Sequence, residues 1–193
     1  MRNCANSSGD PVDLASQPQA IREQAAALLV EGFREPRGWA SLGDARAEVA
    51  RVLHEGFARA VVDDGVLLGW IGGCPHRGYD GNVWEVHPMV VRPDSRRRGI
   101  GRRLAEAFEH EAGIRGALTA FLGTDDDSGM TSLSDVNLYD DTPKHIAGVR
   151  DRGRGHPFEF YRRLGYVVVG VMPDANGPGR PDIYMAKRLR GRE

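Results

Sequence analysis

The sequence predicts an α/β fold in which a mixed, mostly antiparallel sheet is flanked by helices on both faces. Three features support this prediction. Two amphipathic segments with apolar residues at helical spacing come first. Three short, mostly apolar segments follow and are joined by turn signals, a pattern typical of an antiparallel meander. In the second half of the chain, helical and strand segments alternate, so helices are available for both faces of the sheet.

The first third of the chain contains a short irregular segment and two helices. We expect residues 1–17 to form a flexible N-terminal segment with at most a short strand at Val12–Leu14. The first helix opens at Pro18, because proline is favoured at the first helical position, and ends near Gly32. A second helix follows Ser41, whose hydroxyl is suited to capping a helix N-terminus.

The central segments predict three antiparallel strands. They are Phe57–Val62, Val66–Cys74 and Val83–Val91, which are mostly apolar, and the last of them is rich in β-branched residues. Asp64-Gly65 lies between the first two and Asp80-Gly81 precedes the third, and both pairs are typical of tight turns. A three-stranded meander therefore forms the middle of the predicted sheet.

The second half of the chain predicts two helices and three strands around a long irregular segment. No clear periodicity is found from 123 to 155, and an irregular segment of this length is usually functional or disordered. The predicted elements are a helix over 101–112, a strand at Ala117–Leu122, a short helix from His156-Pro157 to Gly165, and strands at Val167–Val171 and Ile183–Met185.

Composition limits the classes of function. The 193 residues suffice for one domain, which we expect over 18–193. The formal net charge of −1 gives no global field for nucleic acid or membrane binding. No apolar run approaches the roughly 18–20 residues that span a bilayer. The start lacks an apolar signal-peptide core, so we expect a cytoplasmic protein. Cys4 and Cys74 suggest no disulfide or metal site.

A basic, glycine-rich turn connects the third strand of the meander to the following helix. It reads Arg96-Arg97-Arg98-Gly99-Ile100-Gly101, and apolar residues at helical spacing follow it. A turn of this kind brings free backbone N–H groups and the positive end of a helix dipole to an anion such as pyrophosphate. The alternative is a solvated basic loop before an ordinary amphipathic helix. The turn matches neither the P-loop nor the Rossmann fingerprint.

The turn resembles the acetyl-CoA pyrophosphate loop of the GNAT acetyltransferase superfamily, with Arg96, Gly99 and Gly101 at the signature positions. Further stretches between about 57 and 188 resemble the aminoglycoside 6′-N-acetyltransferase branch of that superfamily. These stretches are Trp84-Glu85-Val86-His87-Pro88, Gly123-Thr124-Asp125-Asp126, Thr131-Ser132-Leu133-Ser134, His156-Pro157-Phe158-Glu159-Phe160-Tyr161, Leu164-Gly165-Tyr166, Pro173-Asp174-Ala175-Asn176-Gly177 and Pro181-Asp182-Ile183. The N-terminal third matches the branch poorly.

The resemblance implies a GNAT-type sheet, acetyl-CoA as cosubstrate and direct acetyl transfer to the 6′-amine of an aminoglycoside antibiotic within a ternary complex. It also implies a resistance role and a homodimer. The implied cofactor-binding residues are Met89, Val90, Val91, Arg96, Arg97, Arg98, Gly99, Ile100, Gly101 and Arg102. The pantetheine would pair with the backbone of the first three, and a backbone N–H near Met89 would polarise the thioester carbonyl.

Five residues are candidates for acid–base catalysis. Glu85 and His87 lie two apart on one strand and therefore face the same side. An ammonium acceptor must lose a proton before it attacks a thioester, and a carboxylate or imidazole can take that proton. The base is one of Glu85, His87, Asp125 and Asp126, and the sequence does not choose among them. For Glu85 and His87 the alternative is an ordinary surface pair without a catalytic role. The resemblance implies that Tyr161 protonates the departing thiolate; simple core packing is its alternative.

An acidic segment points to a cationic acceptor. From Gly123 to Pro143 the chain has six aspartates and no lysine or arginine. A solvated loop is the default interpretation, but an acidic cleft would also concentrate a polycation. We expect Trp39, Glu85, Asp125, Asp126 and Asp135 to bind the acceptor. A peptide or protein amine, or acetyl-CoA binding without turnover, are the alternatives to an aminoglycoside.

Overall fold

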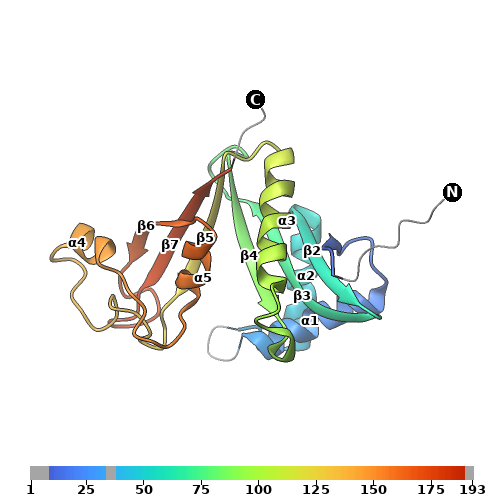
Figure 1. Cartoon of the computed structure of the whole chain (residues 1–193), viewed down its shortest axis with the longest axis horizontal. Helices are drawn as coiled ribbons and strands as arrows, with labels where there is room; N and C mark the ends of the chain where they lie inside the picture. Colours follow the sequence, from blue (N-terminus) through green and yellow to red (C-terminus); the bar gives the residue numbers. More distant parts are fainter. Residues whose placement is uncertain (1–8, 34–37, 190–193) are drawn as a thin grey trace. The chain divides into compact units, whose positions relative to one another are not determined.

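The computed structural model describes residues 9–33 and 38–189 (Figure 1). The chain divides into two compact units, the first formed by Met1–Leu118 with Leu189–Glu193 and the second by Thr119–Arg188. Cys4 and the first eight residues of the expected N-terminal segment lie outside the described residues. Among the described residues, no helix is long and apolar enough to cross a membrane, and no group of three His, Cys, Asp or Glu side chains is arranged to hold a metal ion.

The first unit contains the predicted meander. Its strands are β1 (Val12–Asp13), β2 (Phe57–Asp63), β3 (Val66–Pro75) and β4 (Val83–Val91), in the spatial order β1-β2-β3-β4 and with every pairing antiparallel. The turn between β2 and β3 places Asp64 at φ 46° and Gly65 at φ 74°, the two positive φ values that a tight hairpin turn requires. The meander and its turn are therefore confirmed.

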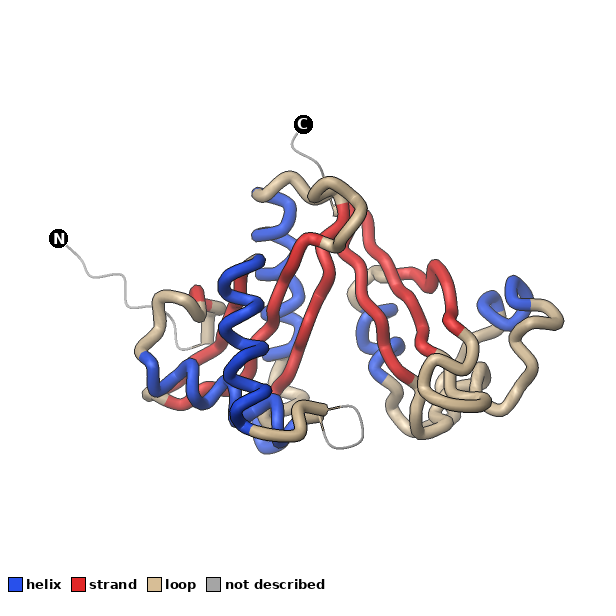
Figure 2. The backbone as a smooth tube through the Cα atoms, turned by 180° about the vertical axis from the view of Figure 1, so that it is seen from behind, coloured by secondary structure: helices blue, strands red, loops and turns tan. Residues whose placement is uncertain are grey.

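Three helices cover the two faces of this sheet. The helices α1 (Gln19–Gly32) and α2 (Leu42–Glu55) lie on one face and α3 (Ile100–Ile114) on the other, as Figures 1 and 2 show from opposite sides. On the α1 side, the Trp70 indole donates to the carbonyl of Ala25 at 3.2 Å; on the α3 side, the Phe57 ring packs against Phe108 at 5.6 Å. The predicted α/β class, with helices on both faces, is confirmed here.

Apolar side chains at helical spacing explain why these helices pack as they do. The Ser41 hydroxyl accepts the N–H of Asp44 at 3.1 Å and so starts α2 as expected. The core between the sheet and the first two helices contains Leu14, Ile21, Leu28, Leu29, Val49, Val52, Leu67, Trp70 and Val90.

Strand β4 carries a bulge at its centre. Val86 pairs with Gly73 and Met89 with Ile71, so two residues of β4, His87 and Pro88, oppose a single residue of β3. The peptide bond between them is cis. A bulge bends the strand locally and increases its twist, so it can re-aim a side chain next to an active site. Glu85 lies before this bulge, His87 is part of it, and Met89, Val90 and Val91, the residues predicted to pair with the donor, follow it.

The second unit has three strands and two short helices. The strands β5 (Thr119–Asp125), β7 (Asp182–Arg188) and β6 (Val167–Met172) follow one another in space in that order, with antiparallel pairings. Helix α5 (Pro157–Arg163) matches the prediction, whereas α4 (Thr142–Ala147) lies within the segment that showed no periodicity. The reason is that α4 buries none of its residues and has only six, so no apolar stripe marks it.

Strand β5 lies further along the chain than predicted. It starts at Thr119 and continues through Gly123 and Thr124 to Asp125, which pairs with Asp182. Apolar periodicity ends at Leu122, and for that reason the sequence prediction ended there. The extension places Asp125 at the last position of the strand.

Candidate active site

The turn before α3 has the geometry of an anion-binding site. Gly99 is the N-cap of α3 in the left-handed conformation at φ 79°, and Arg97 is also left-handed at φ 62°. The first intrahelical bond runs from the Arg103 N–H to the Gly99 carbonyl at 3.1 Å, and among the residues that the structure describes no side chain caps the helix. The preceding N–H groups of the first turn have no acceptor within the helix and are available to a ligand.

Cationic side chains surround this turn. Arg96, Arg97 and Arg98 are exposed, and among the described residues none of the three forms an ion pair. Arg96 is oriented by a bond from its Nε to the carbonyl of Val91 at 3.2 Å. Arg102 lies 3.8 Å from Glu106 in the next turn of the helix. A pyrophosphate thus fits both the backbone and the charge of the turn.

His87 lies in a polar cluster with a residue of α2. Its Nε2 is 3.3 Å from Oε1 of Glu48, and the same oxygen is 2.6 Å from the guanidinium of Arg51. Burial alone would raise the pKa of Glu48, but the hydrogen bonds with His87 and Arg51 outweigh burial and lower it to about 2. Glu48 is therefore ionised and orients the His87 imidazole. The His87 side chain itself is 45% exposed.

Trp39 contacts the same histidine. Its ring centroid is 6.0 Å from that of His87 and 5.2 Å from that of Phe33, which it meets edge-on. Glu85 is half-buried on β4 and pairs in register with Cys74. The structure thus brings Trp39 and His87 together in the first unit. Their predicted roles, and that of Glu85, stay predictions.

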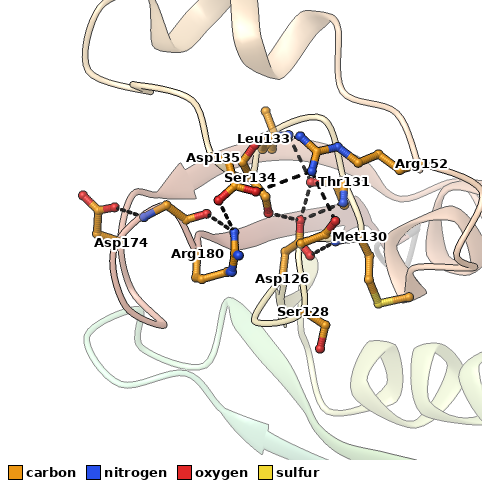
Figure 3. Close-up of polar contacts among 12 residues, drawn as sticks. Asp126, Ser128, Met130, Thr131, Leu133, Ser134, Asp135, Arg152, Asp174 and Arg180 are labelled. Atoms are coloured by element: carbon orange, nitrogen blue, oxygen red, sulfur yellow. Dashed lines mark hydrogen bonds and ion pairs between the residues drawn. The ribbon is translucent and has the colours of Figure 1, made fainter.

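Asp126 is the centre of the acidic loop in the second unit (Figure 3). Its side chain is fully buried and its two oxygens accept four hydrogen bonds. The donors are the N–H of Met130 at 2.5 Å, the N–H and hydroxyl of Thr131 at 2.8 and 2.6 Å, and the Ser134 hydroxyl at 2.5 Å. Burial would raise the pKa of Asp126, but these bonds hold it below its ordinary value. The buried carboxylate organises the loop.

Arginines from outside the acidic segment balance part of its charge. Arg180 lies 2.6 Å from Asp135, and Arg152 lies 3.7 Å from the other oxygen of Asp135 (Figure 3). Arg152 also donates to the carbonyls of Ser134 at 2.9 Å and Gly129 at 3.3 Å. Asp135 is consequently an ion-paired residue, and a cationic acceptor would have to compete with both guanidinium groups for it.

Asp125 is the exposed aspartate nearest to the end of β5. In the described part of the chain, its carboxylate has no hydrogen bond and no ion pair, while its carbonyl accepts a bond from His156 Nε2 at 3.0 Å. Its carboxylate is therefore accessible to solvent and to a cation. Of the three aspartates predicted to bind the acceptor, Asp125 is the one whose carboxylate the protein itself does not use.

Tyr161 lies in α5 and is almost entirely buried. Its ring meets those of Phe160 and Tyr166 edge-on, with centroids 5.1 and 5.5 Å away. Burial raises the pKa of the Tyr161 phenol above its ordinary value, so the group keeps its proton at every physiological pH. A protonated phenol is a hydrogen-bond donor.

A family model described as the acetyltransferase (GNAT) family matches residues 22–139, which is more than half of the chain. The chain belongs to the GNAT acetyltransferase family. No curated protein sequence matches it.

Solved structures extend this assignment over almost the whole chain. An aminoglycoside 6′-N-acetyltransferase complexed with coenzyme A is 36% identical, with 95% of this chain and 98% of that chain aligned and a TM-score of 0.84. The aminoglycoside 6′-N-acetyltransferase from Enterococcus faecium gives the same identity and coverage with a TM-score of 0.83. An aminoglycoside 6′-acetyltransferase type Ii is 34% identical over 95% of this chain and 99% of its own, with a TM-score of 0.70. The predicted resemblance to this branch is confirmed.

As a GNAT acetyltransferase, the chain uses acetyl-CoA as its acetyl donor. The turn at 96–102 could hold the pyrophosphate of this donor, because backbone N–H groups at an uncapped helix start and several arginine side chains favour an anion.

Two residues near the predicted site were missed from the sequence. Glu48 shares the buried stripe of α2 with Ala45, Val49 and Val52, so a carboxylate at an apolar-stripe position was the available signal. His156 was recognised only as part of the start of a helix, although histidine is not among the residues preferred at an N-cap.

Proposed function

We propose that the chain is an aminoglycoside 6′-N-acetyltransferase that transfers the acetyl group directly within a ternary complex. The observation that carries the proposal is sequence identity of 34–36% over 95% of the chain to three solved structures with that activity in their names. Identity at this level over both chains, rather than a shared fold alone, favours a shared acceptor.

Acetyl-CoA supplies an acetyl thioester. We assign its pyrophosphate to the N–H groups and guanidinium groups at 96–102, as the charge and the uncapped helix favour. Backbone groups of Met89, Val90 and Val91 would align the donor, and an N–H near Met89 would stabilise the oxyanion. The bulge that precedes Met89 supports this assignment, since bulges re-aim the backbone next to active sites.

The acceptor amine must be deprotonated, and three residues are proposed for this step. His87 is supported by Glu48, whose ionised carboxylate lies 3.3 Å from Nε2 of the imidazole and orients the ring. Asp125 is supported by its exposed and unengaged carboxylate. Glu85 is supported by its place on the same strand as His87. We propose Tyr161 as the proton donor to the thiolate, since its buried phenol keeps its proton.

For the cationic acceptor we propose Asp125 as the principal anchor. Asp135 would bind an ammonium group of the acceptor only if that group displaced the arginine with which Asp135 is paired. Asp126 would act indirectly, by holding the loop in its conformation. Trp39 would contact a sugar ring from its place beside His87.

The test compares acceptors that differ at one group. Neomycin has a 6′-amine and paromomycin a 6′-hydroxyl on otherwise the same scaffold. We expect release of CoA thiol with neomycin, kanamycin and tobramycin, and a kcat/KM for paromomycin that is lower by at least about 10³-fold. Equal turnover of neomycin and paromomycin would refute the 6′ assignment. Preference for a lysine-rich peptide over the drugs would refute the aminoglycoside assignment.

The same proposal includes a resistance role, a homodimer, a cytoplasmic location and a single catalytic domain over 18–193. Expression of the chain in a susceptible bacterium should raise the inhibitory concentration of tobramycin, while the Tyr161→Phe variant should not. Light scattering of the purified protein should give the mass of two chains. An unchanged inhibitory concentration would contradict the resistance role, and a single-chain mass would contradict the dimer.

A further inference from the structure

His156 is a buried histidine whose two ring nitrogens are both hydrogen-bonded within the second unit. Its exposed fraction is 1%. The ring Nδ1 accepts the N–H of Phe158 at 3.2 Å, and Nε2 lies 3.0 Å from the carbonyl oxygen of Asp125. The imidazole therefore joins the last residue of β5 to the first turn of α5.

The partners define the tautomer of this ring. A backbone N–H is only a donor, so Nδ1 must be without a proton to accept from Phe158. A backbone carbonyl is only an acceptor, so Nε2 must carry the proton that it donates to Asp125. The ring is thus the neutral Nε2–H tautomer, and each nitrogen makes one specific bond.

Residues before the ring hold it in place. Oδ1 of Asp151 accepts the N–H of His156 at 3.3 Å and that of Arg154 at 3.2 Å, while Oδ2 accepts the N–H of Gly155 at 2.8 Å. The ring of Phe158 lies 5.6 Å from the imidazole. The backbone and the ring of His156 are therefore both fixed, which is what a residue that sets the position of others requires.

The two ends of this bridge are the elements that carry two proposed catalytic residues. Asp125 is itself one end of the bridge, and α5 carries Tyr161 one turn after the other end. We propose that His156 is a positioning residue for acetyl transfer, which fixes the main chain of Asp125 to the helix of Tyr161. This inference rests on the proposed function of those two residues.

A helix cap alone does not require this arrangement. Serine, threonine, aspartate and asparagine cap helices at least as well, and all are shorter than histidine. Histidine adds a donor at the far side of its ring, and that donor is the one that reaches Asp125. The bond to Asp125 is what distinguishes a bridge from a cap.

Two substitutions break one bond each. In His156→Asn, the side-chain oxygen lies as many bonds from Cβ as Nδ1 does, so the cap on Phe158 is kept and the bond to Asp125 is lost. In His156→Gln, the amide nitrogen lies as many bonds from Cβ as Nε2 does, so the bond to Asp125 is kept and the cap is lost. His110→Asn, on the exposed side of α3, is the matched control.

If His156 is a bridge, each substitution should lower kcat about tenfold, with KM for acetyl-CoA unchanged within about twofold, while the control keeps the wild-type values. Assays are made well below the melting temperature of each variant. Full kcat in His156→Asn would mean that only the cap on Phe158 matters for turnover. Full kcat in His156→Gln would mean that only the bond to Asp125 matters. Either result overturns the proposal.

A second readout does not depend on the reaction. Long-range ¹H–¹⁵N NMR of the wild-type imidazole should show a proton on Nε2 and none on Nδ1, and the Phe158 amide should exchange slowly in the wild type and fast in His156→Gln. A proton on Nδ1 would overturn the bridge even if the enzyme is active. A wild-type chain that turns over no aminoglycoside but shows this tautomer would refute the proposed function and retain the bridge.

Discussion

Replacing Asp126 with asparagine should destabilise the second unit. The change keeps the shape of the side chain and removes its charge and one of its two acceptor oxygens. Four donors now meet the carboxylate, three of them at Oδ2 and the Met130 N–H at Oδ1. In the best arrangement of the amide, its oxygen serves the three donors and its NH₂ group faces the N–H of Met130, which then has no acceptor.

The magnitude follows from these contacts. A buried donor without an acceptor costs about 1–3 kcal/mol, and the three remaining bonds lose the strength that an ionised acceptor gives them. We therefore expect the free energy of unfolding to fall by about 2–4 kcal/mol at neutral pH. The folded-state pKa of Asp126 is lowered, so this difference is fully present above its ordinary pKa of 3.8 and shrinks as the pH falls through the folded value.

The assay must report on the second unit. All three tryptophans, Trp39, Trp70 and Trp84, lie in the first unit, so urea unfolding should be followed by far-UV circular dichroism and by amide exchange at Met130 and Thr131. Asp127→Asn is the matched control, since Asp127 is exposed and should change stability by less than about 0.5 kcal/mol. Equal stability of the two variants would refute the reasoning.

Three further predictions concern other parts of the chain. Tyr161→Phe should lower kcat at least about tenfold with unchanged circular dichroism, and full turnover would remove Tyr161 from the reaction. Gly99→Ala should destabilise the chain by about 1 kcal/mol and raise KM for acetyl-CoA, because φ is 79° at this position. Gly113→Ala, inside α3 with open space around it, should stabilise the chain by about 0.5–1 kcal/mol. Changes in unfolding free energy of the same sign for both variants would contradict this prediction. Glu48→Gln should lower the free energy of unfolding by about 3 kcal/mol at neutral pH, as measured by urea titrations at several pH values. Because the pKa of Glu48 is lowered in the folded state, this difference should vanish as the pH falls from about 4.5 to about 2. A difference in unfolding free energy that persists at pH 2 would refute the prediction.

Elements with a strong local pattern could be predicted from the sequence. The α1 helix follows from apolar residues at helical spacing, and the hairpin between β2 and β3 from Asp64-Gly65. The family could also be predicted, because the basic turn and the stretches around Glu85 and Tyr161 are distinctive.

Features that depend on distant contacts could not be predicted. Helix α4 has six residues, none of them fully buried, and carries no apolar stripe. The charge of the acidic segment depends on Arg152 and Arg180, which are remote in sequence from Asp135, so the segment looked more negative in isolation than it is. The buried state of Asp126 follows from donors that only the folded loop brings together.

The bulge in β4 and the bridge at His156 are further examples. Buried and half-buried residues alternate without interruption along 83–91, so the register shift of one residue at His87 and Pro88 could not be predicted from the apolar pattern. The partner of His156 lies 31 residues earlier in the chain, and only the fold brings the two together.

The central claim is that the chain acetylates the 6′-amine of an aminoglycoside with acetyl-CoA. The most direct measurement is NMR of tobramycin after exhaustive reaction with the chain and [1-¹³C]acetyl-CoA. We expect one acetyl group per tobramycin molecule, with the labelled carbonyl coupled to the 6′-amide proton. An acetyl group on any other nitrogen, or none at all, would contradict it.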